Sequence, residues 1–324
     1  MEQENTVGRN FSVLKEYGEE LTSKTYITNP AIAREEEIKK LIMVLLTPEK
    51  SGLLVGKAGI GKTAIVEGLA YLIQRNEVPD VLKGYRIIKV SSVSLLGKIM
   101  IDGKEDMIIS LLVKELKQEQ KMIVFIDEVH TLIGGREDGP MDLANILKPA
   151  LDRGDVKAIG ATTTQEYETY IIRDRAFLRR FERIEVMEPD EPTTVKILME
   201  SLPKIEKQTG IKFKYNAYVT QLLVESIVSA TSEFKRVYGL AAMYPDVSFS
   251  VLTAAFSQAL FQNRSEVNLL DVYNAIKTSK RIYPDSIIKE LNIFREKFAD
   301  LSKQEEIELP IVEIDEIKGE DDYY

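Results

Sequence analysis

The stretch that decides the fold of this chain is LLVGKAGIGKT, residues 53–63. Its second part, from Gly56 to Thr63, matches the phosphate-binding pattern G-x-x-x-x-G-K-[ST] at every defined position. A short apolar strand pattern over 53–55 precedes the motif, and helical spacing over 63–74 follows it. A strand, a glycine-rich turn and a helix in this order predict a loop that cradles phosphate groups.

Each residue type in the motif has a physical task. The glycines let backbone N–H groups turn toward an anion, and the amides at the start of the helix point the same way. Lys62 supplies a cation to the β- and γ-phosphates, and the Thr63 hydroxyl is a ligand for Mg²⁺. A glycine-rich turn that binds nothing is the alternative, and the complete motif in this context argues against it. We therefore expect ATP and Mg²⁺, with the phosphates held by Gly56, Ala58, Gly59, Ile60, Gly61, Lys62, Thr63 and Ala64.

A second apolar run ends in two acids. Residues 122–126 are MIVFI, and Asp127 and Glu128 follow directly. Asp127 is expected to hold Mg²⁺ together with Thr63, and Glu128 to orient and polarise the attacking water. A plain strand end is the alternative reading. His130 is the only histidine, so a metal site built from histidines is not expected, and we assign it a structural place behind the acids.

Further apolar runs alternate with helical patterns. Strand patterns occur at 86–90, 157–162 and 183–187, and helical patterns at 34–46, 107–117 and 142–151. Continuous apolar strands between helices predict an α/β fold, in which helices sandwich a parallel sheet. Such a sheet places its ligand at the carboxyl ends of the strands. After Pro189 and Pro192 the patterns become helical and predict a smaller, mostly helical lid domain.

These patterns divide the chain into five parts. We expect a leader over 1–28 with an amphipathic helical stretch at 11–21, and a large nucleotide-binding domain over 29–189. A helical small domain over 190–283, a C-terminal helix over 284–303 and an acidic tail over 304–324 complete the division.

Composition and charge exclude several classes of protein. The chain of 324 residues has no cysteine, which excludes disulfides and thiolate metal sites. No apolar run reaches the length of a membrane span, and the polar N-terminus lacks a signal core, so we expect a cytoplasmic protein without membrane contact. No basic stripe marks a nucleic-acid interface, and nucleic acid is not an expected partner.

The net charge of −9 is concentrated at one end. Residues 304–324 hold nine acids and one lysine, a net −8, so the rest of the chain carries only −1. A solvated tail is the simpler interpretation, and a docking segment for a basic partner is the alternative.

Several segments together resemble a known family. They are Leu14–Thr22, Asn29–Ile38, Gly61–Ala70 (GKTAIVEGLA), Asn145–Leu151, Gly160–Thr163 and Arg179–Phe181. In this order and spacing they resemble the first ATPase module of the Clp-type AAA+ unfoldases and disaggregases. The resemblance covers residues 11–200 and extends more weakly to 283.

The resemblance implies roles that the motifs alone do not. Thr163 would sense the γ-phosphate, and Arg179 and Arg180 would reach the nucleotide of a neighbouring copy. That implies a homo-oligomer, a hexameric ring or open spiral, acting on a protein partner. The adenine side would be formed by Ile32, Ala33, Ile197 and Pro245.

The chain departs from the family pattern at several places. Ile101 stands where the family has an aromatic residue in the pore loop, here residues 97–104, and it offers less contact area for threading a polypeptide. Ala33 stands where glycine is usual, and no lysine follows Asp246. We also expect the chain to lack the family's N-terminal substrate domain, its coiled-coil domain and its second ATPase module.

Three functions remain open from the sequence. The first is a compact AAA+ ATPase that oligomerises and remodels a protein partner. The second is a nucleotide-gated interaction module that threads no polypeptide. The third, a DNA-linked AAA+ initiator or transposition helper, is disfavoured by the near-neutral body of the chain.

Overall fold

The structure, a computed structural model, describes residues 6–7, 12–101, 103–133, 146, 156–238 and 243–312. The chain forms two compact units, each with its own apolar core. The first comprises Met1–Lys57 and Lys62–Met187, and the second comprises Ala58–Gly61 and Glu188–Tyr324.

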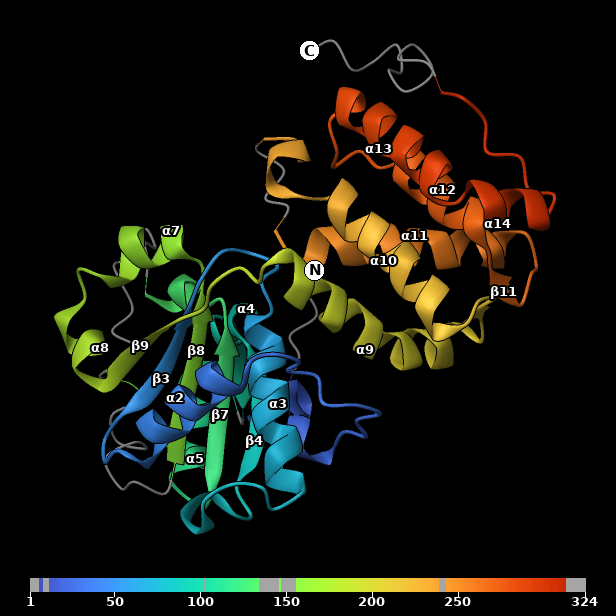
Figure 1. Cartoon of the computed structure of the whole chain (residues 1–324). Helices are drawn as coiled ribbons and strands as arrows, with labels where there is room; N and C mark the ends of the chain where they lie inside the picture. The colour runs from blue at the N-terminus through green and yellow to red at the C-terminus, as the bar shows by residue number, and fades with distance from the viewer. Residues whose placement is uncertain are drawn as a thin grey trace. The chain divides into compact units, whose positions relative to one another are not determined.

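The first unit is built on a six-stranded sheet with the order β2-β4-β7-β8-β3-β9 (Figure 1). All neighbours in it are parallel except β2, which pairs antiparallel with β4. The predicted α/β fold is thereby confirmed. The strands are β2 (Gly18–Glu20), β3 (Ser51–Val55), β4 (Arg86–Ser91), β7 (Met122–Asp127), β8 (Val156–Thr162) and β9 (Phe181–Glu185).

The strand order determines where the predicted site residues meet. β8 lies between β3, which precedes the phosphate loop, and β7, which ends in the acids. In register, Val55 lies beside Thr162, and Ile126 lies beside Gly160. Because the three strands are parallel, their carboxyl ends meet at one edge of the sheet.

Helices bury both faces of this sheet, which explains the continuous apolar strands. Every residue of β3 is buried. On one face, Leu53 and Val55 share a core with Leu112 of α5. On the other, α2 contacts β3 and β9 and packs on α3. The bounds are α2 (Glu35–Leu46), α3 (Lys62–Gln74) and α5 (Ile108–Leu116).

The segment expected to form an amphipathic helix over 11–21 differs from that prediction. It forms α1 (Val13–Tyr17), then edge strand β2, then the 3-10 turn η1 (Leu21–Ser23). Gly18 ends the helix in an extended conformation. A Cβ there would lie 2.3 Å from the Leu14 carbonyl oxygen and 2.8 Å from a methyl group of Ile88, so only glycine fits this junction of helix and sheet.

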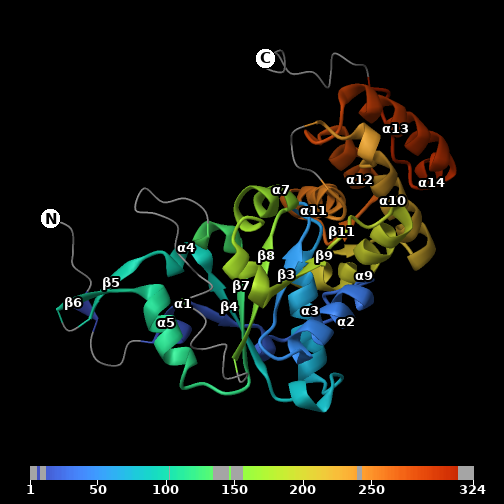
Figure 2. The ribbon, with the colours of Figure 1, turned by 90° about the vertical axis from the view of Figure 1, so that its left-hand side faces the viewer.

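The predicted pore segment forms a hairpin outside the main sheet. β5 (Lys98–Ile101) pairs antiparallel with β6 (Lys104–Met107), and β1 (Thr6–Val7) pairs parallel with β5. Figure 2 shows β5 and β6 beyond α5, away from the strands of the main sheet. Ile101 is half-buried and packs against the core of its own unit.

Short elements complete the first unit. They are α4 (Ser92–Leu95), η2 (Asp80–Leu82), η3 (Val129–Leu132), α7 (Thr164–Glu166), the π-helical turn η4 (Tyr167–Ile171) and α8 (Arg175–Arg180). The helix predicted over 142–151, including the motif match at Asn145–Leu151, lies outside the described residues apart from Ile146.

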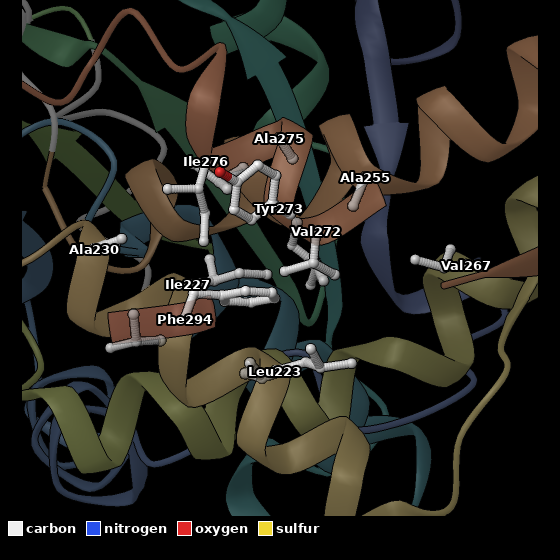
Figure 3. Packing of buried hydrophobic residues seen from close by; sticks show 14 of the residues in the cluster. Leu223, Ile227, Ala230, Ala255, Val267, Val272, Tyr273, Ala275, Ile276 and Phe294 are labelled. Atoms are coloured by element: carbon white, nitrogen blue, oxygen red, sulfur yellow. The ribbon is translucent and has the colours of Figure 1, made fainter. Parts of the chain in front are cut away.

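The second unit is mostly helical, as its patterns predict. Its core brings together Leu223 and Ile227 of α10, Ala255 of α11, and the T-shaped ring pair Tyr273–Phe294 (Figure 3). The helices are α9 (Glu191–Thr209), α10 (Ala217–Ala230), η5 (Glu233–Lys235), α11 (Asp246–Phe261), α12 (Leu269–Lys277), α13 (Pro284–Lys297) and α14 (Ala299–Gln304). The second unit also contains a parallel pair of two-residue strands, β10 (Lys212–Phe213) and β11 (Glu266–Val267).

The end of the chain differs from the expected helix and solvated tail. Two helices, α13 and α14, replace the single helix expected over 284–303. Beyond them, Leu309 and Val312 are buried in the core of the second unit. The Arg295 side chain donates a hydrogen bond to the Leu309 carbonyl at 3.1 Å, and Tyr215 donates one to Glu305 at 2.7 Å. The first part of the acidic segment is therefore docked by its apolar residues, and residues 313–324 lie outside the described part.

No helix in the described ranges combines the length and the apolar composition needed to cross a membrane.

Candidate nucleotide site

The phosphate loop connects β3 to α3 as the sequence predicts. Gly59 and Gly61 have φ values of 76° and 99°, a left-handed region that favours glycine. Lys62 begins α3, and its ammonium group folds back over the loop. It donates to the carbonyl oxygens of Gly56 at 2.7 Å and Lys57 at 2.9 Å. The cation is thus held at the mouth of the loop by neutral acceptors, which an incoming phosphate can replace.

The electrostatics of Lys62 reflect its surroundings. Burial lowers the pKa of its ammonium group, although the negative charges of Asp127, Glu166 and Glu128 oppose that shift. A partly desolvated cation interacts more strongly with an anion than a cation in bulk water does. The position therefore favours binding of a multiply charged phosphate chain.

The metal ligands predicted from the sequence lie together. The Thr63 hydroxyl donates to the Asp127 Oδ2 atom at 3.0 Å, and the Glu128 backbone N–H donates to Oδ1 at 3.1 Å. Hydroxyl and carboxylate oxygens suit Mg²⁺, which proteins commonly hold by one or two such ligands together with substrate phosphates and water. The described residues contain no cluster of three or more His, Cys, Asp or Glu that could hold a metal unaided. This donor pair fits magnesium bound together with a nucleotide.

Glu128 occupies a strained position directly after β7. Its φ of 52° lies in the left-handed region, which non-glycine residues rarely adopt. Such strain concentrates at functional sites, where the surrounding structure imposes it. The residue is exposed, and its carboxylate makes no hydrogen bond or ion pair within the described ranges. With no partner among the described residues, this carboxylate can accept a hydrogen bond from water.

Thr163 follows β8 and begins the short helix α7. Its hydroxyl oxygen accepts a hydrogen bond from the Glu166 N–H at 3.2 Å, and the Glu166 carboxylate accepts one from the Thr163 N–H at 2.9 Å. This capping box commits the Thr163 oxygen as an acceptor. The Thr163 side chain also lies close enough to the Glu166 carboxylate to help lower the pKa of that carboxyl.

Glu166 is a site residue that the sequence interpretation missed. Burial tends to raise the pKa of its carboxyl, but hydrogen bonds from Thr163 and Thr162 and the charge of His130 hold that pKa below its usual value. The His130 Nδ1 atom lies 3.1 Å from Glu166 Oε2, and its ring stacks on Tyr170. The structural role expected for His130 fits this geometry, which links the loop after β7 to the end of β8. The pattern T-x-x-E at 163–166 was the available signal for Glu166.

Arg179 and Arg180 form the last turn of α8. Arg179 is exposed, and its guanidinium group has no partner among the described residues. Arg180 is half-buried and makes one long hydrogen bond, 3.4 Å, to the Ala176 carbonyl. Neither contacts Lys62 or Asp127 within the described part of the first unit, so this pair is not brought into the phosphate site of its own chain.

The segment expected beside adenine has an unusual backbone. Ile32 is buried, and Ala33 has a φ of 55° at the position where the family resemblance leads one to expect glycine. Arg34 secures the segment, because it donates to Glu37 at 2.8 Å and to the Met187 carbonyl at 3.0 Å. The other two expected adenine contacts, Ile197 on α9 and Pro245 before α11, belong to the second unit.

Comparison with known proteins defines the class. Residues 52–189 match the family described as ATPase family associated with various cellular activities (AAA). Chaperone protein ClpB of Porphyromonas gingivalis is 34% identical over 293 residues, covering 90% of this chain and 32% of that protein. Chaperone protein ClpB of Bacteroides thetaiotaomicron is 33% identical over 314 residues, covering 95% of this chain and 34% of that protein.

Solved structures show the same relationship. The S. cerevisiae Hsp104–ADP complex matches with a TM-score of 0.66 and 31% identity, over 90% of this chain and 48% of that one. The extended conformation of the S. cerevisiae Hsp104:casein complex matches with a TM-score of 0.65 and 33% identity, over 79% of this chain and 43% of that one. The chain spans about a third of the length of the curated relatives. Residues 52–189 form an AAA domain, and the chain is homologous to about one module of the ClpB and Hsp104 chains, as a Clp-type AAA+ module is, which confirms the resemblance identified from the sequence.

Proposed function

We propose that this protein binds ATP with Mg²⁺, hydrolyses it, and acts as an oligomer that remodels a protein partner. The observation that carries the proposal is the convergence of Lys62, Asp127 and Thr163 at the carboxyl ends of β3, β7 and β8. These groups come from three separate stretches of the chain, and the parallel order of the strands brings them to one edge of the sheet.

The chain's own residues suggest a division of labour. Lys62 leaves the loop carbonyls for the β- and γ-phosphates, and Thr63 and Asp127 provide the oxygen ligands for the metal. A magnesium ion held by these two side chains would supply positive charge to offset that of the phosphate groups. Glu128 accepts a hydrogen bond from the attacking water and orients it, and the Thr163 hydroxyl donates to the γ-phosphate or that water.

The arginines at the end of α8 support an oligomer. An arginine supplied by a neighbouring subunit can stabilise the charge on the transferring phosphoryl group. The guanidinium of Arg179, which has no partner within the described ranges, suits such a contact, and the one hydrogen bond that Arg180 makes there is weak. We propose that both act on the nucleotide of the next copy in a homo-oligomer.

One observation favours the alternative, a nucleotide-gated interaction module. Ile101, at the predicted pore position, is aliphatic and packs partly against the core of its own unit. A residue held in this way presents less surface to a translocating polypeptide than an exposed aromatic ring would. In this alternative ATP still binds and assembly still responds to it, but no polypeptide is pulled.

The test is ATP turnover per subunit as a function of protein concentration. Glu128→Gln should lower turnover about 100-fold or more while nucleotide still binds. Arg179→Ala and Arg180→Ala should each lower turnover by a similar factor, and turnover of the wild type should rise with concentration. Arg175→Ala, an exposed arginine on the same helix, is the matched control. Turnover that is flat with concentration and indifferent to both arginines would refute the shared site.

Casein, which is present in two of the matching Hsp104 complexes, is a suitable probe of the proposed remodelling of a protein partner. Stimulation of turnover by casein, together with unfolding of a labelled casein, would support remodelling. Casein-independent turnover with nucleotide-dependent assembly would instead favour the interaction module.

A further inference from the structure

A lysine on the strand next to the acids lies against the metal-binding carboxylate. Lys89 belongs to β4, where it lies beside Phe125, and Ser91 lies beside Asp127. The Lys89 ammonium nitrogen is 3.6 Å from the Asp127 Oδ2 atom and 5.8 Å from the centre of the Phe125 ring. The stem of the lysine therefore runs along β7 toward its last residue and places a full positive charge there.

The two oxygens of Asp127 are both engaged. Oδ1 accepts the Glu128 N–H, and Oδ2 is shared by the Thr63 hydroxyl at 3.0 Å and the Lys89 ammonium. The other ammonium near this carboxylate, that of Lys62, is bound to carbonyl oxygens of the phosphate loop. Within the described ranges, Lys89 is the one cation that forms an ion pair with Asp127.

We propose that Lys89 is a resident counter-charge for Asp127 that makes nucleotide binding only weakly dependent on Mg²⁺. The inference rests on the proposed function, because it takes the site to bind ATP with magnesium. Lys89 is a positioning residue: it acts through Asp127 and not on the reacting atoms.

Two electrostatic consequences follow from the geometry. Without metal, an unpaired Asp127 would repel the phosphate chain, and the Lys89 charge offsets that repulsion. With metal, the Lys89 ammonium and Mg²⁺ compete for the same carboxylate oxygen, so the lysine weakens metal binding. Both groups are about 30% exposed, so solvent screens but does not remove the interaction. Each effect is expected to be roughly three- to tenfold in a binding constant.

The experiment uses the full chain and a fluorescent ADP analogue, which avoids turnover. Its dissociation constant is measured in EDTA and across a Mg²⁺ titration for wild type, Lys89→Met, Lys89→Gln and Lys89→Arg. Lys89→Met keeps an apolar stem over Phe125 but removes the charge, and Lys89→Gln is a second neutral variant. Lys89→Arg retains the positive charge. Lys98→Met is the matched control, because Lys98 is an exposed lysine paired with Glu105 on the β5–β6 hairpin.

We expect the neutral variants to bind the ADP analogue roughly three- to tenfold more weakly in EDTA. They should also reach half-saturation at a lower Mg²⁺ concentration. The dissociation constant in EDTA divided by that at saturating Mg²⁺ should therefore increase about tenfold or more relative to wild type. Lys89→Arg should restore the wild-type ratio, and Lys98→Met should leave it unchanged. A merely structural role for Lys89 would weaken binding equally with and without metal.

Two outcomes overturn the proposal, and they are distinguishable. If wild type binds the nucleotide and both neutral variants show the same ratio of dissociation constants as wild type, Lys89 does not act as the counter-charge. The proposed function then still stands. If wild type binds no nucleotide at any Mg²⁺ concentration, the proposed function fails and this inference fails with it.

Discussion

Gly68 of α3 provides a sharp test of how the 31–33 segment, which is expected beside adenine, is packed. A Cβ built on Gly68 would lie 2.2 Å from the Ala31 Cβ and 3.1 Å from the Ile38 Cδ1 atom. Carbon atoms pack comfortably at roughly 3.5–4.0 Å, so the first contact overlaps by more than an ångström. Ile38 can rotate its terminal methyl group, but the Ala31 Cβ is fixed to the backbone. Gly68→Ala must therefore push the 31–33 segment away from α3.

The expected change in stability is opposite in sign to the change that helix propensity alone predicts. In an unhindered helix, replacing glycine by alanine stabilises by about 1 kcal/mol. Overpacking a buried contact costs about 1–3 kcal/mol, and the backbone-anchored overlap at Ala31 places this case at the upper end. We expect Gly68→Ala to destabilise the first unit by about 2 kcal/mol and to weaken nucleotide binding, since Ile32 and Ala33 move with Ala31.

The assay is chemical unfolding followed by circular dichroism. Wild type and variant are compared without nucleotide, which gives the change in the free energy of unfolding, and again with ATP, which gives the change in stabilisation by the ligand. The double variant Gly68→Ala/Ala31→Gly transfers the methyl group across the contact and should recover about 1 kcal/mol or more relative to Gly68→Ala alone. A Gly68→Ala protein more stable than wild type, or a double variant without recovery, would refute the packing argument.

Three further predictions address other parts of the molecule. Ala33→Gly should stabilise the first unit by about 0.5–1 kcal/mol, because alanine adopts the left-handed backbone region at this position only at a cost that glycine does not have. The denaturant midpoints of the two proteins measure this change. Nucleotide affinity should fall as the pH rises through the lowered pKa of Lys62, since the phosphates bind its ammonium form and that form is lost at a lower pH than in an ordinary lysine. Dissociation constants measured between about pH 7.5 and 10 test this, with tighter or constant binding at high pH as the contradicting result. Leu309→Ala should destabilise the second unit by about 2–3 kcal/mol, and Ile311→Ala, an exposed neighbour, by about 0.5 kcal/mol or less; equal effects would show that this segment is not docked.

The parts of the site that could be predicted from the sequence are those determined by local pattern. The loop from Gly56 to Thr63 and the acids after 122–126 follow directly on buried strands, and both are recognisable without knowledge of distant contacts. The parallel sheet is likewise indicated by its continuous apolar strands, since strands covered on both faces have no polar side.

Predictions failed where local pattern and tertiary contact disagree. The helix expected over 11–21 stops at Gly18, because pairing of Glu19 and Glu20 with β4 satisfies more backbone groups than a further helical turn at the surface would. The acidic composition after residue 304 indicated solvent exposure, yet Leu309 and Val312 are buried among the helices of the second unit. Composition averages over a segment, whereas burial is decided residue by residue.

The candidate chemistry of this protein follows from its sequence: a phosphate-binding motif, an acid proposed to hold metal, a carboxylate proposed to orient water, and the sheet that carries them. Which of these groups lie together depends on the folded structure. The order of β3, β8 and β7 places Thr163 between the loop and the acids, and the register of β4 on β7 brings Lys89 to Asp127. The reason is physical: strand order and register are determined by long-range packing, and no local pattern contains the distance between two side chains from different strands.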